Sequence, residues 1–357
     1  MTKKHAVFMR RAIDLAEKGR GGVGTNPLVG TVVVRGGRIV GRGWHSRFGE
    51  PHAEAIALSQ AGERAKGADL YVTMEPCSGT GKTPPCTRMI IAAGIKRVVY
   101  ACCDPHEKGK GLKDVRKHGI KVVGGVMERE AGEQNIEYFT RGETCRPFLT
   151  LKLAITMDGR TRDGRGRSKW ITSPTARAWT RGMRGRVDAI MVGTGTVLAD
   201  DPRLTAPAGG SQPLKIIVDG NGRTPPSARL LRSGMTLIAA TGRAPKARLR
   251  ALRARGAEIM TVGLRKREVN LSELMRALFR RGVGSILCEG GATLAGALIA
   301  QGLVDRAVTV IAPKLMGNRP VAMCLGLGAP KTIRIGPDLA VLADRVVPIM
   351  HSRCFPA

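Results

Sequence analysis

The chain has 357 residues, of which 43% are hydrophobic and 24% charged, and its formal net charge is +31. This length suits two domains that each bury a core. No apolar run approaches the roughly 20 residues of a membrane span, and the charged, amphipathic start of the chain does not resemble a signal peptide. The eight cysteines are irregularly spaced, which argues against a disulfide framework and favours a reduced, cytoplasmic setting.

The excess of basic residues would attract polyanions and concentrate phosphorylated substrates. It is also typical of nucleic-acid binders. However, only 3% of the residues are aromatic, so stacking platforms for single strands are scarce. The arginines are scattered rather than clustered on one arm. We therefore favour a basic surface with phosphate-handling sites over nucleic-acid contact.

The first 145 residues alternate strands and helices. The stretch 31–44 predicts two strands joined by a two-residue turn at Gly36-Gly37. Residues 51–62 predict a helix with Pro51 in its first turn and Gly62 as its stop. The order of elements predicts a three-layer α/β domain. Its other expected elements are strands at 69–76, 96–103 and 120–125, and helices at 84–94, 112–119 and Met127 to Arg141.

Around residues 143–147 the pattern resets, and residues 146–357 predict a second α/β domain with a mainly parallel sheet. Its strands are expected at 147–156, 187–195, 213–220, 235–242, 257–263, 285–291 and 306–313. Its helices are expected at 244–255, 271–281 and 292–302.

Four residues of the first domain form a candidate metal site. His52, Cys77 and Cys86 offer the imidazole and thiolate ligands of a catalytic zinc site with a position left for water. Glu54, two residues after the histidine, could move protons to and from that water without binding the metal. Each part alone is weak, because His-x-Glu is common and buried structural cysteines occur. The order of strand hairpin, His-Ala-Glu helix, strand, Pro-Cys and helix is the signature of zinc-dependent nucleobase deaminases.

Two further residues belong near that site if it exists. Asn26 precedes the first strand in "TNPLVG", where it is either an ordinary turn former or a hydrogen-bonding partner for a pyrimidine edge. His45, at the end of the following strand, is a weaker candidate for the same pocket.

The second domain carries two glycine-rich turns after strands. "SILCEGGATLAGALIAQGLVD" reads as a buried strand, a turn at Gly290 and Gly291, and a helix whose free N–H groups suit a phosphate. "VDAIMVGTGTVLADDP" repeats the strand and turn, although the third glycine of a Rossmann fingerprint is missing. Together they favour a dinucleotide site. Lys152, Ser168, Trp170 and Arg184 lie beside these elements and could equally be ordinary surface or core residues.

Over nearly its full length the sequence resembles the bifunctional riboflavin-biosynthesis family, in which a diaminohydroxyphosphoribosylaminopyrimidine deaminase is fused to a 5-amino-6-(5-phosphoribosylamino)uracil reductase. The resemblance is carried by "NPLVGTVVV", "GWHSRFGEPHAEAIAL", "YVTMEPCSGTGKTPPCTRMI", "LKLAITMDGRT", "SKWITSPTAR", "VDAIMVGTGTVLADDPRLT", "EGGATLAGALI" and "LVDRAVTVIAPKLMG", in the family's order. The eight residues between the two cysteines match that family's spacing.

The resemblance implies a cytidine-deaminase-like domain over 1–145 and a dihydrofolate-reductase-like domain over 146–357. It implies zinc on His52, Cys77 and Cys86, Glu54 as proton shuttle, Lys152 beside the reacting ribose, and NADPH as hydride donor. Positions matching cofactor contacts are Ala154, Trp170, Thr196, Asp200, Gly220, Gly291, Ala292, Thr293, Leu294, Ala295, Gly296 and Ala297. Positions matching substrate contacts are Asn26, His45, Ser168, Arg184, Leu204 and Glu289.

The resemblance further implies a phosphorylated pyrimidine substrate and a homo-oligomer. The sequence departs from the family at Pro207, where an arginine is usual. A phosphate contact is therefore missing, unless Arg203 or the basic loop at 164–167 replaces it. The loop at 104–111 is two residues shorter than usual. The remaining alternatives are a chain with one degenerate half and a nucleic-acid deaminase.

Overall fold

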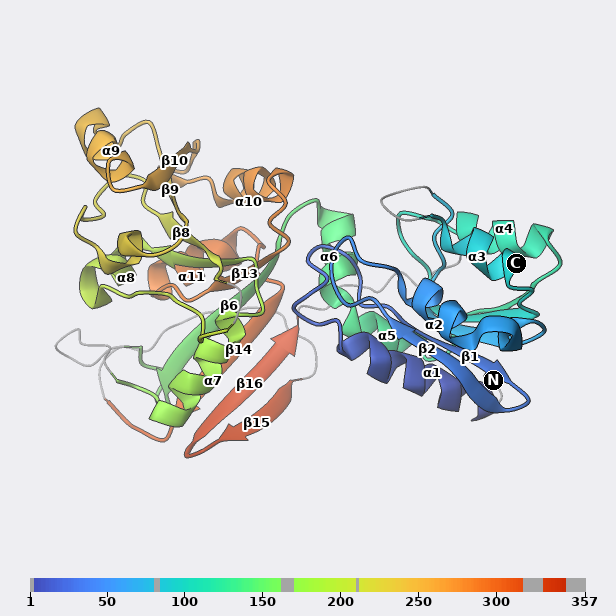
Figure 1. Cartoon of the computed structure of the whole chain (residues 1–357). Coiled ribbons are helices and arrows are strands. Elements are labelled where there is room, and N and C mark those ends of the chain that lie inside the picture. The colour runs from blue at the N-terminus through green and yellow to red at the C-terminus, as the bar shows by residue number, and fades with distance from the viewer. Residues whose placement is uncertain (1–2, 80–83, 162–169, 210–211, 317–329, 345–357) are drawn as a thin grey trace. The chain divides into compact units, whose positions relative to one another are not determined.

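The computed structural model describes residues 3–79, 84–161, 170–209, 212–316 and 330–344 (Figure 1). The chain divides into two compact units, and the division falls between Thr144 and Cys145. Within the described residues no helix has both the length and the apolar character needed to cross a membrane.

The first unit is built on a five-stranded sheet in the order β2-β1-β3-β4-β5. Strand β1 pairs antiparallel with β2 and β3, while β3, β4 and β5 run parallel. The strands are β1 Gly30–Arg35, β2 Arg38–Trp44, β3 Asp69–Met74, β4 Arg97–Cys102 and β5 Lys121–Val123.

Helices cover both faces of this sheet. Successive strand residues point to opposite sides, so the apolar residues of β1 give the sheet two apolar faces that must each be buried. Val33 packs in one core with residues of helices α2, α3 and α4, and Val32 and Val34 pack in another with α1 and α5. This confirms the expected three layers. The helices are α1 Lys3–Glu17, α2 Ala53–Ala61, η1 Gly62–Ala65, α3 Cys86–Ala92, α4 Lys110–Lys117, α5 Glu128–Gln134 and α6 Ile136–Thr144.

The prediction of one closing helix from Met127 to Arg141 is wrong. Two helices, α5 and α6, are separated at Asn135, whose backbone (φ −106°, ψ 17°) leaves the helical conformation. The Asn135 side chain bonds both backbone groups of Leu28. That tertiary contact outweighs the helical pattern of the local sequence.

The second unit contains a nine-stranded sheet in the order β10-β9-β8-β7-β13-β6-β14-β16-β15. All pairs from β10 to β14 are parallel, whereas β16 and β15 are antiparallel additions at one edge. The strands are β6 Phe148–Thr156, β7 Ala189–Gly193, β8 Leu214–Val218, β9 Thr236–Ala240, β10 Ala257–Thr261, β13 Ser285–Cys288, β14 Arg306–Ala312, β15 Lys331–Ile335 and β16 Asp338–Asp344.

Several elements of this unit were not predicted from the sequence. They are α7 Pro174–Arg184, α8 Thr194–Asp200, the turn η2 Arg229–Arg232, strands β15 and β16, and the hairpin of β11 Leu264–Arg265 with β12 Glu268–Val269. Helix α7 has a readable start, since Ser173 caps the Ala176 N–H and Pro174 follows it. The expected helices are present as α9 Lys246–Arg253, α10 Leu271–Arg280 and α11 Ala292–Ala300.

Candidate functional site

Helix α2 lies unusually close to strand β2, and this sets the position of the candidate metal site. A Cβ on Gly43 would stand 2.1 Å from the Ala53 carbonyl oxygen, and one on Gly41 would stand 2.1 Å from that of Ala57. Glycine at these two positions lets the helix backbone touch the strand. The helix therefore begins at the sheet surface, with His52 as its N-cap residue and Glu54 in its first turn.

The three proposed metal ligands converge, although they come from separate segments. His52 Nδ1 is 3.5 Å from Cys77 Sγ and 3.3 Å from Cys86 Sγ, and all three ligand atoms lie within 4.8 Å of one another. Tetrahedral zinc, with Zn–S and Zn–N bonds of about 2.3 and 2.0 Å, needs ligand atoms about 3.5 Å apart. The donor types and spacings therefore fit zinc.

The pKa values of the two cysteine thiols are shifted in opposite directions, which suits metal binding. Hydrogen bonding from Cys86 holds the pKa of Cys77 well below its usual range, while the same bond and burial raise the pKa of Cys86. The hydrogen bond to Cys77 raises the pKa of His52. One thiolate is thus stabilised already, and a cation would displace the remaining protons.

Glu54 lies beside this group without belonging to it. The residue is 3% exposed, and burial, followed by the nearby Cys77 charge, raises its pKa to about 7. Its carboxyl group interacts with Cys86 rather than joining the ligand set. A carboxyl group in these surroundings can both accept and donate a proton near neutral pH.

Asn26 and His45 meet beside the metal ligands. Asn26 Nδ2 lies 3.1 Å from His45 Nε2, and His45 Nδ1 lies 3.3 Å from the Pro51 carbonyl oxygen. Since a carbonyl only accepts, Nδ1 donates and Nε2 accepts from the Asn26 amide. Burial lowers the pKa of His45, which keeps that tautomer neutral. The His45 and His52 rings are 5.5 Å apart.

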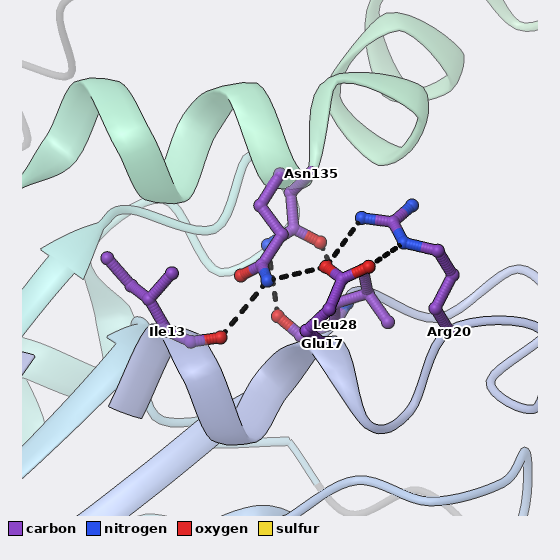
Figure 2. A network of polar contacts seen from close by, with 6 residues as sticks. Ile13, Glu17, Arg20, Leu28 and Asn135 are labelled. Carbon is purple, nitrogen blue, oxygen red and sulfur yellow. Dashed lines mark hydrogen bonds and ion pairs between the residues drawn. The ribbon is translucent and has the colours of Figure 1, made fainter. Parts of the chain in front are cut away.

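The segment carrying Asn26 is anchored on both sides by the last two helices of the unit. Asn135 Oδ1 accepts from Leu28 N at 2.7 Å, and its Nδ2 donates to Leu28 O at 2.9 Å (Figure 2). Arg141 Nη2 donates to Thr25 O at 2.6 Å. Sequence reasoning missed Asn135 and Arg141. An asparagine inside an expected helix was the available signal, because it is a poor interior residue.

In the second unit, Lys152 of β6 and Glu289, which directly follows β13, lie side by side on neighbouring strands. Cys288 of β13 pairs with Leu151 of β6 in parallel register, so the residues that follow each are adjacent. Burial lowers the pKa of Lys152, and the Glu289 charge opposes this shift. The carboxylate therefore helps to keep the lysine cationic.

Arg184 of α7 closes this group through a bidentate ion pair. Its Nε and Nη2 bind the two Glu289 carboxylate oxygens at 2.7 and 3.0 Å, and Nη1 donates to Thr205 O at 3.2 Å. These contacts use three of the five guanidinium N–H groups. Lys152, Arg184 and Glu289, singled out from the sequence, thus share one site at the sheet.

The helix expected to hold a phosphate begins at the same edge of the sheet. Gly291 is the N-cap of α11, and its N–H donates to Thr196 Oγ1 at 3.2 Å. The Gly193 backbone that precedes α8 is close to Leu294, whose Cβ lies 3.6 Å from the position of a Cβ on Gly193. The two glycine-rich turns, which are distant in sequence, are therefore neighbours.

The remaining predicted positions lie on several elements. Ala154 is on β6, Asp200 ends α8 and Gly220 follows β8. Trp170 is 62% exposed, with the Arg177 guanidinium 4.4 Å from its ring centre. Leu204 is buried in a left-handed conformation (φ 54°). Residues 292–297 form the first turns of α11. Ser168 and the basic loop at 164–167 lie outside the described residues.

Five cysteines of the described residues carry free thiols: Cys77, Cys86, Cys102, Cys145 and Cys288. Burial raises the pKa of both Cys102 and Cys288 to about 12, so these two behave as core residues.

Both units match known families. Residues 2–102 match the cytidine and deoxycytidylate deaminase zinc-binding region, and residues 147–338 match the RibD C-terminal domain. These matches support a cytidine-deaminase-like unit followed by a reductase unit similar to dihydrofolate reductase, which confirms the expected fold class.

Curated relatives match over nearly the full length of both chains. The chain is 39% identical to riboflavin biosynthesis protein RibD of Aquifex aeolicus, over 95% of this chain and 98% of the relative. It is 40% identical to RibD of Escherichia coli, over 94% and 97% of the two chains.

Solved structures agree. The structure of Acinetobacter baumannii RibD matches with a TM-score of 0.86 at 32% identity, covering 97% of this chain and 99% of that one. The diaminohydroxyphosphoribosylaminopyrimidine deaminase/5-amino-6-(5-phosphoribosylamino)uracil reductase of Thermotoga maritima matches with a TM-score of 0.82 at 33% identity, covering 96% and 99%. With both families, their order and the full length in agreement, the chain belongs to the RibD family of riboflavin biosynthesis proteins.

Proposed function

We propose that this chain performs two consecutive steps of riboflavin biosynthesis. The first unit removes the amine from 2,5-diamino-6-(5-phosphoribosylamino)pyrimidin-4-one by hydrolysis. The second unit then reduces the ribosyl group of 5-amino-6-(5-phosphoribosylamino)uracil to a ribityl chain with NADPH. The observation that carries the proposal is the pairing, on one RibD-family chain, of the convergent His52, Cys77 and Cys86 atoms with the Lys152 and Glu289 site.

In the first unit, His52, Cys77 and Cys86 would hold zinc, which supplies a Lewis acid that activates water at neutral pH. Glu54 takes the proton of the attacking water and returns it to the departing amine nitrogen. Its raised pKa, about 7, suits both directions of transfer. Because Glu54 is buried and not a ligand, it can carry out this cycle without leaving its position.

Asn26 would recognise the pyrimidine. Its Nδ2 group is committed to His45 Nε2, and this contact orients the amide so that its oxygen is presented as an acceptor. Burial lowers the pKa of His45 and so favours its neutral form, while its bond to Pro51 O fixes which ring nitrogen carries the proton. Together they would select a ring edge that donates hydrogen bonds beside the carbon that reacts.

In the second unit, NADPH, when bound, would supply the hydride that reduces the opened ribose at C1. The α11 N-terminus and the neighbouring Thr196 are suited to the phosphates of the dinucleotide. Lys152, whose positive charge the Glu289 carboxylate favours, would stabilise charge and hold a proton at the ribose oxygen. Arg184 positions Glu289, and its two remaining N–H groups suit the anionic substrate.

Two separate assays on one preparation test this function. Wild-type protein should release ammonia from the diaminopyrimidine and oxidise NADPH with the deaminated product. Glu54→Ala should abolish only the first activity, and Lys152→Ala only the second. Loss of both activities from either single substitution would contradict the division of labour. A wild-type chain with just one activity would show that the other half is degenerate.

A further inference from the structure

The peptide segment around Cys77 is bound through a buried carboxylate to residues 104–112, which comprise a loop and the first turn of α4 and are called the loop below. Glu75, two residues before the cysteine, is buried. Its Oε2 accepts from Asp104 N at 3.3 Å and Gly109 N at 3.1 Å, and its Oε1 accepts from Leu112 N at 3.4 Å. Three backbone donors, spread over the whole loop, therefore converge on this one side chain.

A second carboxylate makes the reverse connection, from the loop to the segment that carries Cys77. Glu107 belongs to the loop, and its Oε2 accepts from both the backbone N–H (3.0 Å) and the hydroxyl (2.5 Å) of Ser78. Ser78 directly follows Cys77. The metal-binding residue is thus bracketed, with Glu75 reaching from its segment into the loop and Glu107 reaching back. We call this pair the carboxylate clamp.

The backbone of the loop also packs directly against the backbone of the Cys77 segment. A Cβ on Gly111 would lie 1.8 Å from the Pro76 carbonyl oxygen, so the first turn of α4 rests directly on the residue before Cys77. Lys108 and Gly109 are both left-handed, with φ of 51° and 82°. This sharp bend lets the Gly109 N–H face Glu75 while the Glu107 side chain faces Ser78.

On its other side Cys77 meets the start of helix α3. The N–H of Cys86 donates to Cys77 Sγ at 3.4 Å, and the N–H of Thr87 donates to Cys77 O at 3.2 Å. Helix α3 thus fixes the sulfur, and the loop fixes the backbone on both sides of it. Movement of the loop would swing the Cys77 side chain relative to His52.

We propose that Glu75 and Glu107 are positioning residues for the deaminase, acting by holding Cys77 Sγ at the distance from His52 and Cys86 that the metal requires. This role rests on the proposed zinc deaminase function of the first unit. Groups that hold metal ligands through hydrogen bonds commonly change metal affinity when they are removed.

The test is zinc affinity, measured by competition with a chromophoric chelator. Glu107→Ala should weaken zinc binding by about 10-fold. In the cobalt-substituted protein it should also change the visible d–d and thiolate-to-metal bands. A loop that is merely structural would leave the cobalt spectrum unchanged. Reductase activity, on the same chain, reports that the second unit is folded, and the far-UV circular dichroism spectrum reports the fold of the chain as a whole. Glu63→Ala, at an exposed carboxylate of η1, is the matched control and should bind zinc as the wild type does.

Two further variants keep the outcome decisive if Glu107→Ala folds poorly. Glu107→Gln retains an acceptor for the Ser78 N–H and should bind zinc more tightly than Glu107→Ala. Ser78→Ala removes only the hydroxyl bond to Glu107 and keeps the backbone one, so it should weaken binding less than Glu107→Ala and add little to it. Wild-type zinc affinity and an unaltered cobalt spectrum in Glu107→Ala would overturn the inference while leaving the deaminase assignment intact. Failure of the unsubstituted chain to bind zinc would overturn both.

Discussion

The side chain of Asn135 makes both of the backbone hydrogen bonds that a neighbouring strand would make to Leu28 (Figure 2). Leu28 is buried, and Asn26, the proposed pyrimidine contact, lies two residues before it. One amide on the helix side of the unit thereby fixes a turn at the candidate active site. The bond between Arg141 and Thr25 O fixes the same turn from its other end.

Asn135→Ala should therefore affect both stability and substrate binding. It leaves a buried N–H and a buried C=O of Leu28 without their partners, at a cost of about 1–3 kcal/mol in the free energy of unfolding. The KM of the deaminase should rise more than its kcat falls, because the turn that carries Asn26 loosens while the metal ligands stay in place. Urea denaturation and steady-state kinetics measure the two effects.

The adjacent Gln134 provides the control for this substitution. Its side chain donates to Ile13 O and to Glu17, so its two hydrogen bonds go to helix α1 and not to the Asn26 turn. Gln134→Ala should lower stability without changing the deaminase KM. Equal KM values in the two variants would argue against a role for Asn135 in substrate binding.

The sequence was sufficient for the elements with clear periodicity and for the metal ligands. The hairpin turned by Gly36 and Gly37 formed as expected because both residues adopt positive φ, at 56° and 76°, which glycine favours. His52, Cys77 and Cys86 were found because their residue types and spacing are specific to one kind of chemistry. In both cases the information is local or lies in a short motif.

What the sequence could not provide depends on contacts between distant residues. The break at Asn135 is made by a partner 107 residues away, and no local propensity reveals it. Arg184 was expected to meet substrate, yet its guanidinium pairs with Glu289, 105 residues along the chain. Glu75 stands within the recognised "EPC" motif, but its role becomes visible only when the loop at 104–112 lies on it.

The close approach of α2 to β2 predicts that Gly43 cannot be enlarged. In Gly43→Ala the new Cβ would lie 2.1 Å from Ala53 O, so the start of α2 must move away from the sheet. We expect a loss of about 1–3 kcal/mol of stability, as for other overpacked positions, together with weaker zinc binding because His52 caps this helix. Thermal unfolding and metal content after dialysis measure both.

A matched alanine substitution isolates the steric effect. Gly142 lies in α6, and the nearest atom to a Cβ there is 3.5 Å away. Gly142→Ala should be neutral or slightly stabilising, since alanine favours the helix by roughly 0.5–1 kcal/mol over glycine. Similar losses in both variants would mean that the α2 contact is not the cause.

Removal of the metal should make the ligand cysteine Cys77 reactive toward alkylation and leave the buried core cysteines Cys102 and Cys288 unreactive. With zinc bound, Cys77 and Cys86 should resist alkylation at pH 7, and after chelation Cys77 should react quickly because its pKa is held low. Cys102 and Cys288, with pKa values of about 12, should stay unmodified until the protein unfolds. Mass spectrometry of digests identifies the labelled sites, and exposed Cys145 serves as the positive control. Labelling of Cys77 at the same rate before and after chelation would contradict zinc ligation by this residue.

The charges around Lys152 predict opposite pH shifts for two substitutions in the reductase. Burial lowers the pKa of Lys152, the Glu289 carboxylate raises it and the Arg184 guanidinium lowers it further. A lysine loses its charge as the pH rises through its pKa, so an activity that needs the cation declines on the alkaline side. Glu289→Gln should move that decline in kcat to lower pH, and Arg184→Gln should move it to higher pH. Because both variants break the same ion pair, a general disturbance of the site would shift the two profiles in the same direction, and that result would exclude Lys152 as the titrating group.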